Sequence, residues 1–228
     1  IVVAIGVVMV LLIFVIPVFE GMFKDMGAEL PLPTQIVINI SKFVKSYIIY
    51  MVVALGIGVF LFRRYYRTEG GRRTIDRLVL KVPVFGVLAL KASVARVTRT
   101  LSTLLSSGVA ILESLVIVAR VAKNKIVEDA LIVARTKISE GKSMSEPLQD
   151  SGIFPPMVVQ MVQVGESTGA LDNMLNKIAD FYEEDVDNLV TNLTSLMEPL
   201  IMMFLGVILG GLIIAMYLPI FKLGQAVG

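Results

Sequence analysis

Cysteine and histidine are both missing from the 228 residues of this sequence. In the residues given, their absence excludes disulfides, thiolate or imidazole metal sites, and nucleophilic catalysis that depends on His or Cys. Any chemistry here would have to use carboxylates, hydroxyls or lysines. Charge is also scarce, since charged residues make up 18% of the chain and hydrophobic residues 56%. This balance predicts a membrane protein that carries a polar domain.

Three charge-free runs are candidates for membrane spans. A helix rises about 1.5 Å per residue and needs about 20 residues to cross a hydrocarbon core. We therefore predict transmembrane helices at residues 1–19, with a truncated start, at 46–62, which is short, and at 199–221. A cleaved signal peptide is the alternative for the first run, but it lacks a basic n-region. Residues 20–45 are predicted to form a connector and residues 222–228 a short tail.

Basic residues gather directly after the second run. The segment from Arg63 to Arg99 holds ten basic residues and two acidic ones. A cluster of this kind beside a span normally stays in the cytoplasm, so we expect a cytoplasmic domain at 63–198, with the connector and the C-terminal tail in the periplasm. The candidate partner contacts in this cluster are Arg63, Arg64, Arg67, Arg72 and Arg73. Contact with anionic headgroups is an equally good interpretation.

The pattern of residues 63–198 is helical throughout, and the fold class is predicted to be all-α, with an antiparallel bundle of about six helices. Apolar residues at helical spacing indicate helices around 94–105, 111–122 and 127–138. Ser143 and Glu146 have the spacing of a capping box for a short fourth helix, and Pro156 suits the first turn of a fifth. Glu166, between two glycines, is expected to bind amides at the start of the next helix; a partner or ion contact is the alternative.

An acidic amphipathic helix from Leu171 leads into the third apolar run. Its candidate partner contacts are Glu183, Glu184 and Asp187, and a solvated acidic face is the alternative. Carboxylates on a helix, without histidines or a calcium-loop pattern, do not favour a metal site. The helix meets the third span at Glu198 and Pro199, a candidate mechanical junction. A proline there permits either a new helix start or one continuous, kinked helix.

Small residues four positions apart occur in two of the predicted spans. These candidates for close helix packing in the membrane are Ala54, Gly58, Gly206 and Gly210, with a partner helix in the same chain or in another one. The spans lack paired acids or buried cations, which disfavours a proton-driven transporter or an intramembrane hydrolase. Gly141-Lys142-Ser143 is not a phosphate-binding loop, because Thr136 stands where that motif requires glycine.

Several short motifs, in this order, resemble those of the polytopic inner-membrane platform proteins of type IV pilus and type II secretion machines. They are Pro83-Val-Phe-Gly86, Arg99-Thr-Leu-Ser-Thr-Leu-Leu-Ser-Ser-Gly108-Val, Glu140-Gly-Lys-Ser-Met144, Phe154-Pro155, Val164-Gly-Glu-Ser-Thr-Gly169, Phe181-Tyr-Glu-Glu184, Glu198-Pro199 and Met216-Tyr-Leu-Pro-Ile-Phe-Lys222. The ending resembles the pilus branch of the family. The sequence departs from the family pattern at Val97, Ala110 and Thr168.

The resemblance implies a non-enzymatic platform in the bacterial inner membrane that links cytoplasmic hexameric ATPases for pilus assembly and retraction to pilin insertion or extraction. Inner-membrane alignment proteins, pilin subunits, the lipid bilayer and further copies of the chain are the implied partners. Family members usually carry a homologous cytoplasmic domain before the first span, so 63–198 would be the second of two such domains. We expect no cofactor, no metal and no nucleic acid. A type II secretion platform is the alternative within the family, and a small oligomeric transporter or channel is the alternative from another class.

Overall fold

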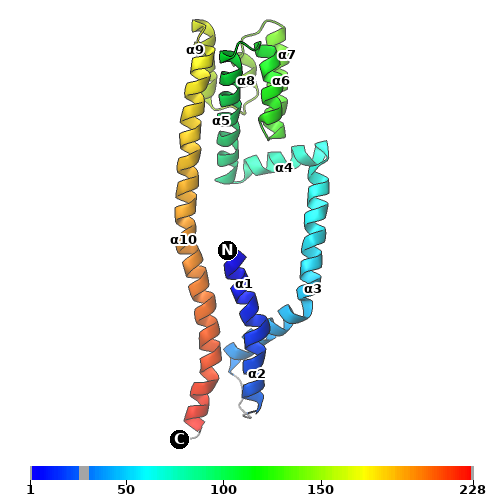
Figure 1. The fold of residues 1–228 in the computed structure, drawn as a ribbon, viewed down its shortest axis with the longest axis vertical. Helices are drawn as coiled ribbons and strands as arrows, with labels where there is room; N and C mark the ends of the chain where they lie inside the picture. Colours follow the sequence, from blue (N-terminus) through cyan, green and yellow to red (C-terminus); the bar gives the residue numbers. More distant parts are fainter. Residues whose placement is uncertain (1, 26–30, 227–228) are drawn as a thin grey trace. The chain divides into compact units, whose positions relative to one another are not determined.

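The computed structural model describes residues 2–25 and 31–226, and its regular elements there are all helices (Figure 1). In chain order they are α1 (Val2–Val10), the π-helical segment η1 (Leu11–Val15), α2 (Ile16–Asp25), α3 (Leu32–Tyr66), α4 (Glu69–Lys81), α5 (Phe85–Ser106), α6 (Ile111–Val121), α7 (Lys125–Ser139), α8 (Ser145–Asp150), α9 (Pro156–Thr168) and α10 (Leu171–Ala226). Three helical segments are long and apolar enough to cross a membrane, at Val3–Met22, Leu32–Tyr66 and Leu171–Leu218. The predicted all-α class with three transmembrane helices is confirmed.

Residue contacts divide the chain into two compact units. The membrane unit comprises Ile1–Leu61 and Leu193–Gly228, and the helical unit comprises Phe62–Asn192. Helices α3 and α10 each contribute residues to both units, so the helical unit is inserted between two membrane segments of the chain. The connector predicted at 20–45 is largely helical where it is described, because α2 extends to Asp25 and α3 begins at Leu32.

The membrane unit has a small apolar core that joins three parts of the chain. Its buried residues are Leu12, Ile16, Ile38, Val44 and Leu212. Two hydroxyls of α3 donate hydrogen bonds to main-chain carbonyls of the neighbouring helices: Ser41 to Leu12, and Thr34 to Ala215 at 2.5 Å. In apolar surroundings a hydroxyl needs such a partner, so these bonds add to the packing that holds α3 against α10 and the N-terminal helices.

The first apolar helix continues through Pro17 and past residue 19, where the first span was predicted to end. Residues Leu11–Val15 form a π-helical segment, and α2 then carries the helix through Pro17 to Asp25. Proline lacks an N–H donor, and a local π-helical turn is one way to accommodate the missing bond within a membrane helix. Lys42 of α3 forms an ion pair with Glu20 of this helix at 2.7 Å, at the end of the run.

The part of α3 between residues 49 and 62 lacks protein cover within the described residues. Ile49 is 72% exposed, Leu55 is 70% exposed and Phe60 is 65% exposed. A continuous apolar helix surface over residues 49–62 is stable only where another apolar phase covers it. This part of α3 therefore provides the lipid-facing surface expected of a membrane span.

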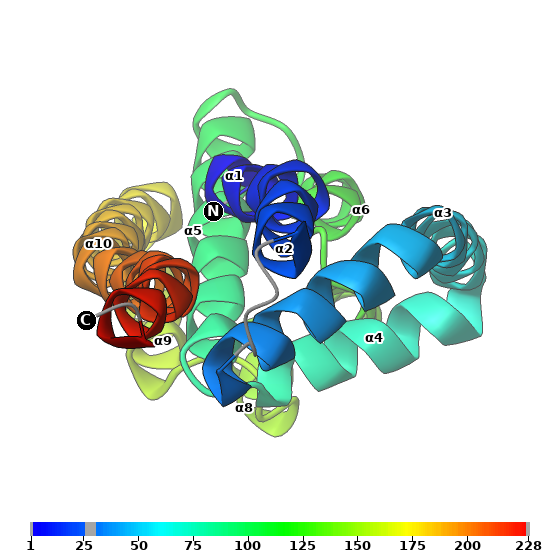
Figure 2. The same ribbon diagram turned by 90° about the horizontal axis from the view of Figure 1, so that it is seen from below.

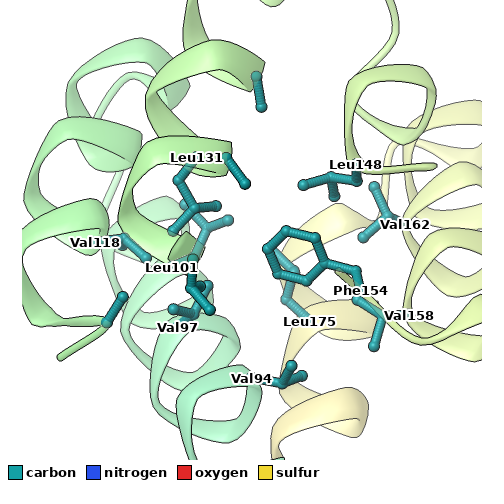
Figure 3. Packing of buried hydrophobic residues seen from close by; sticks show 14 of the residues in the cluster. Val94, Val97, Leu101, Val118, Leu131, Leu148, Phe154, Val158, Val162 and Leu175 are labelled. Carbon is teal, nitrogen blue, oxygen red and sulfur yellow. The ribbon is translucent and has the colours of Figure 1, made fainter. Parts of the chain in front are cut away.

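The core of the helical unit is formed by apolar residues of α5, α6 and α7 facing those of α8, α9 and the first turns of α10. Figure 3 shows Phe154, from the segment before α9, pointing into this core. The largest fully buried side chains are Val94, Leu101, Leu115, Val118, Val127, Leu131, Met144, Leu148, Val158, Val162, Leu175 and Ile178. Full burial of each such side chain stabilises the fold by about 1.5–3 kcal/mol relative to exposure. The predicted helices around 94–105, 111–122 and 127–138 are confirmed by α5, α6 and α7.

Helix α4 was not predicted from the sequence, and two glycines explain how it packs. Thr68 caps its start by accepting a hydrogen bond from the Gly71 amide at 3.1 Å. A Cβ at Gly71 would lie 2.1 Å from the Tyr65 carbonyl oxygen, and one at Gly86 would lie 2.3 Å from the Leu80 carbonyl oxygen. Only glycine permits these approaches, which join α4 to the last turn of α3 and to the first turn of α5. Helices α4 and α5 are bent by 112° at the break between them (Figures 1 and 2).

Candidate functional site

A buried carboxylate at Asp76 links the membrane-proximal end of the helical unit to its bundle. Asp76 is 4% exposed and accepts hydrogen bonds from the Lys125 amide at 2.6 Å and from the Tyr66 hydroxyl at 3.1 Å. It thereby connects the last residue of α3, the middle of α4 and the first residue of α7. Sequence reasoning did not select Asp76, because its partners lie far apart in the chain. The only available signal was an acidic residue within a basic run, and Glu69 carries the same signal.

The five candidate arginines separate into two groups. Arg72 lies 3.6 Å from Glu128 and 3.9 Å from Asp76, and Arg73 lies 3.4 Å from Asp129. These two side chains hold α4 against α7. The other three, Arg63, Arg64 and Arg67, are exposed and form no ion pair within residues 2–25 and 31–226. They are the members of the cluster that remain available to headgroups or to a partner.

The acidic residues of α10 from Asp180 to Asp187, here called the acidic row, also separate into those with partners on other helices and those that are exposed. Arg99 of α5 donates to Glu183 from Nε at 2.9 Å and from Nη2 at 2.7 Å, and it also donates to Asp180 and to the side-chain oxygen of Asn176. The hydrogen bonds from Arg99 lower the pKa of Glu183, and those bonds to Glu183 and Asp180 raise the pKa of Arg99. Glu183 is therefore a structural ion-pair partner of α5.

Two candidates of the acidic row remain exposed. Lys91 forms an ion pair with Asp185 at 2.7 Å, whereas Glu184 and Asp187 form none within the described part of the chain. Asp187 and Glu183 line an open hollow of about 440 Å³ together with Arg96 and Arg99. Charge on both sides of this hollow suits a polar partner surface. The described residues include no group of three or more acidic side chains placed to hold a metal ion.

The capping box predicted for Ser143 and Glu146 is observed only in its serine half: the Ser143 hydroxyl accepts a hydrogen bond from the Ser145 amide at 3.3 Å, but Glu146 does not bond back to the Ser143 amide. Helix α8 begins at Ser145 without a side-chain cap from its own N-cap residue, and Glu146 forms an ion pair with Lys142 at 2.5 Å. Glu166 of α9 supplies further acceptors. Its carboxylate accepts hydrogen bonds from the Met144 amide at 2.6 Å, the Ser145 amide at 3.3 Å and the Ser143 hydroxyl at 2.5 Å.

Glu166 thus binds helix-start amides as predicted, but at a different helix. The expected target was the start of the following helix, α10, whereas the observed target is the start of the preceding one, α8. The reason is that α9 continues to Thr168, so that Glu166 lies on the last turn of α9 and contacts α8 across the bundle. A carboxylate at the positive end of a helix satisfies amides that have no partner within the helix.

The small-residue candidates in the membrane unit make no close helix contact within the described chain. A Cβ at Gly58, Gly206 or Gly210 would meet no heavy atom within 4 Å, and Ala54 is exposed. Packing of these residues against another copy stays a prediction. Glu198 and Pro199 lie within α10, which runs from Leu171 to Ala226 without a break. Of the two alternatives at this junction, the continuous helix is the observed one.

These features define a membrane protein in which a helical unit rich in charged residues is inserted between apolar spans and shares a continuous helix with the last of them. Residues 97–219 match the family described as type II secretion system (T2SS), protein F. The chain belongs to this family.

The relatives of the chain carry pilus and secretion names. It is 51% identical over 227 residues to the type IV pilus assembly protein PilC of Myxococcus xanthus, covering 100% of this chain and 54% of that protein. It is 46% identical over 221 residues to the PilC of Thermus thermophilus, covering 96% and 54%. It is 36% identical over 219 residues to the type II secretion system protein F of Pseudomonas aeruginosa, again covering 96% and 54%. The chain therefore spans a little over half the length of these relatives.

Proposed function

We propose that this chain is part of a non-enzymatic platform of a type IV pilus machine in the bacterial inner membrane. The platform couples a cytoplasmic hexameric ATPase to insertion of pilin subunits into the pilus base or to their extraction from it. Residues 63–198 face the cytoplasm, and the connector and the C-terminal tail face the periplasm. The higher identity to pilus relatives, 51% against 36% for a type II secretion relative, supports the pilus role over the secretion role.

One observation carries the mechanical part of this proposal: α10 belongs to both units. Its first turns contribute Leu175 and Ile178 to the core of the helical unit, and its later turns contribute Leu212 to the core of the membrane unit. A displacement of the helical unit is therefore passed into the membrane span through the backbone of one helix, in which Pro199 is without an N–H donor. Because bending a helix requires its backbone hydrogen bonds to lengthen or break, an uninterrupted helix transmits force better than a flexible linker.

A Gly-Gly insertion directly after Leu196 tests this coupling in cells whose piliation depends on the protein. We expect normal membrane levels and normal co-purification of the ATPase, but loss of pilus assembly, because two glycines weaken the helix between the units. The matched control is a Gly-Gly insertion after Gly141, in the loop between α7 and α8. Normal piliation with the Leu196 insertion would contradict the mechanical role of α10.

The exposed charges provide a surface for the ATPase or for a second copy of the chain. We propose that Arg63, Arg64 and Arg67 on one side, and Glu184 and Asp187 on the other, make these contacts. Arg72, Arg73, Glu166 and Glu183 support the surface from within the chain, because each is engaged in ion pairs or hydrogen bonds of the helical unit.

Charge reversal at Glu184 and Asp187 to Lys tests the acidic part of this surface. We expect weaker co-purification of the ATPase or of a tagged second copy, with a larger difference at low salt than at high salt. Glu113→Lys on the exposed side of α6 is the control for each single reversal, Glu184→Lys or Asp187→Lys, since it makes the same charge change elsewhere on the bundle. Unchanged co-purification at low salt would remove this surface from the proposal.

A further inference from the structure

Helix α4 is amphipathic, but its apolar face is exposed and its polar face packs against the bundle. An ordinary surface helix has the reverse arrangement. Ile75, Leu78, Val79 and Val82 follow the i, i+3, i+4, i+7 spacing of one helix face. Leu78 is 58% exposed and Val82 is 44% exposed. The polar side of α4 instead packs against the bundle, where Asp76 is buried. An apolar face that points away from the core needs another apolar surface to cover it.

The apolar face continues onto the first turn of α5. Phe85 is 61% exposed, Val87 is 50% exposed and Val84 is 48% exposed. Val84 has a φ of 68°, which is uncommon for a β-branched residue, and it forms part of the sharp bend between the helices. Together these residues form one exposed apolar corner, which we define as Leu78, Val79, Val82, Val84, Phe85 and Val87.

The position of this corner in the chain identifies what covers it. Helix α3 is a membrane span that ends at Tyr66, and α4 begins only three residues later, at Glu69. The contact between Gly71 and the Tyr65 carbonyl holds the first turn of α4 against the last turn of α3. Helix α4 therefore starts directly after the end of a span, at the level of the bilayer surface.

The charges beside the corner also suit contact with the bilayer surface. Lys81 lies beside Leu78 at the edge of the apolar face of α4 and forms no ion pair within the described residues, and neither do the three exposed arginines at the end of α3. Arg77 lies on the polar side of α4, where it lines a hollow together with Asp129 and Asp150. A helix with an apolar face flanked by Lys and Arg is typical of binding in the interfacial plane of a membrane, where the cations contact anionic headgroups.

The apolar character of α4 and α5 together also satisfies a simple criterion for a bent membrane span. The packing excludes that interpretation. Val94, Val97 and Leu101 of α5 are buried in the core of the helical unit, and Asp76 of α4 is bonded to Lys125 of α7. Only the corner is free to enter lipid, so that insertion is shallow.

We propose that the apolar corner is a membrane-docking element that inserts into the interfacial layer of the bilayer beside α3, while Lys81 binds anionic headgroups. The proposal rests on α3 crossing the membrane and does not depend on a pilus role. In this arrangement the bilayer covers the corner, and the helical unit is attached to the membrane at α4 in addition to its two chain connections.

Tryptophan fluorescence tests this proposal directly, because the chain has no native Trp. We would make three single variants, Phe60→Trp, Phe85→Trp and Phe181→Trp, and reconstitute each full chain in vesicles of phosphatidylcholine and anionic phosphatidylglycerol. Phe60 lies on the lipid-facing surface of α3, and Phe181 is an exposed aromatic of the helical unit, 51% exposed. They are the positive and negative controls. Leu78→Trp is a second reporter on the corner should Phe85→Trp fail to fold.

Brominated phosphatidylcholine quenches a tryptophan only when the ring contacts lipid. We expect bromination to decrease the emission of Phe85→Trp by about twofold, with a blue shift, because interfacial helices place their apolar face about 5–10 Å into the bilayer. Phe181→Trp should be unaffected. Replacing Lys81 by Gln, or omitting the anionic lipid, should reduce the quenching of Phe85→Trp but not that of Phe60→Trp.

Two results would overturn the proposal. If the emission of Phe85→Trp and Leu78→Trp matches that of Phe181→Trp and is not quenched, the corner lies in water. A blue shift without quenching would show that protein, for example a second copy of the chain, covers the corner in place of lipid.

Discussion

Arg99 of α5 holds both carboxylate oxygens of Glu183 on α10, with donor–acceptor distances of 2.9 Å and 2.7 Å. The two residues are 84 positions apart, and their contact fixes the start of the continuous helix to the bundle. A two-point hydrogen bond between a guanidinium and a carboxylate fixes orientation as well as distance. The pair therefore sets how α10 leaves the helical unit.

Replacing Arg99 should loosen this attachment. We expect Arg99→Ala to lower the free energy of unfolding of the helical unit by about 1–2 kcal/mol, since several charge-assisted bonds on one partly exposed side chain are lost together. Thermal unfolding of the purified chain in detergent, followed by circular dichroism, measures the effect. Arg120→Ala on the exposed end of α6 is the control, and an equal loss of stability in both variants would contradict a special role for Arg99.

The ion pair also predicts a dependence on pH. The bonds from Arg99 lower the pKa of Glu183 below its ordinary value of 4.5, so ionised Glu183 stabilises the folded unit above that value. This stabilisation is lost as the pH falls through the lowered pKa. The difference in Tm between the native chain and Glu183→Gln should therefore be full at neutral pH and should decrease below about pH 4.5. A difference that stays constant into strong acid would contradict the pairing.

The two neighbouring glycines of α4 should respond differently to substitution. Gly71→Ala places a methyl group 2.1 Å from the Tyr65 carbonyl oxygen, and we expect a loss of about 1–3 kcal/mol in stability from the forced displacement. Gly70→Ala meets no atom within 4 Å and should be neutral or stabilising by up to about 1 kcal/mol, because alanine favours a helix. Chemical denaturation of both variants provides the comparison, and equal effects would rule out the close approach.

Glu166 and Glu146 distinguish the observed helix cap from the one expected from the sequence. In Glu166→Ala the Met144 amide loses its acceptor, whereas the Ser145 amide keeps the Ser143 hydroxyl. We expect hydrogen exchange at Met144 to become about 5–30-fold faster, which corresponds to a local loss of about 1–2 kcal/mol. Glu146→Ala should leave these amides protected, because Glu146 pairs only with Lys142 at the surface. Faster exchange in Glu146→Ala than in Glu166→Ala would restore the capping box.

The sequence by itself determined the features that depend on local pattern. Uncharged runs of sufficient length predicted three spans, and apolar residues at helical spacing predicted α5, α6, α7, α9 and the start of α10, because both signals are contained within one segment. The family resemblance likewise rests on short motifs. Helix α4 was missed because Gly70 and Gly71 oppose a helix in sequence terms, whereas Gly71 is required by a contact with α3 that sequence does not reveal.

Only the tertiary structure decided which charges are engaged. Arg72, Arg73, Glu166 and Glu183 have the same character in the sequence as Arg63, Arg67, Glu184 and Asp187, but folding gives the first four partners on other helices. An ion pair depends on two side chains meeting in space, and helical periodicity carries no information about residues far apart in the chain. The structure, and not the sequence, also showed that the helix is continuous at Glu198 and Pro199. It likewise placed the apolar face of α4 on the outside, because that face depends on how α4 packs against the bundle.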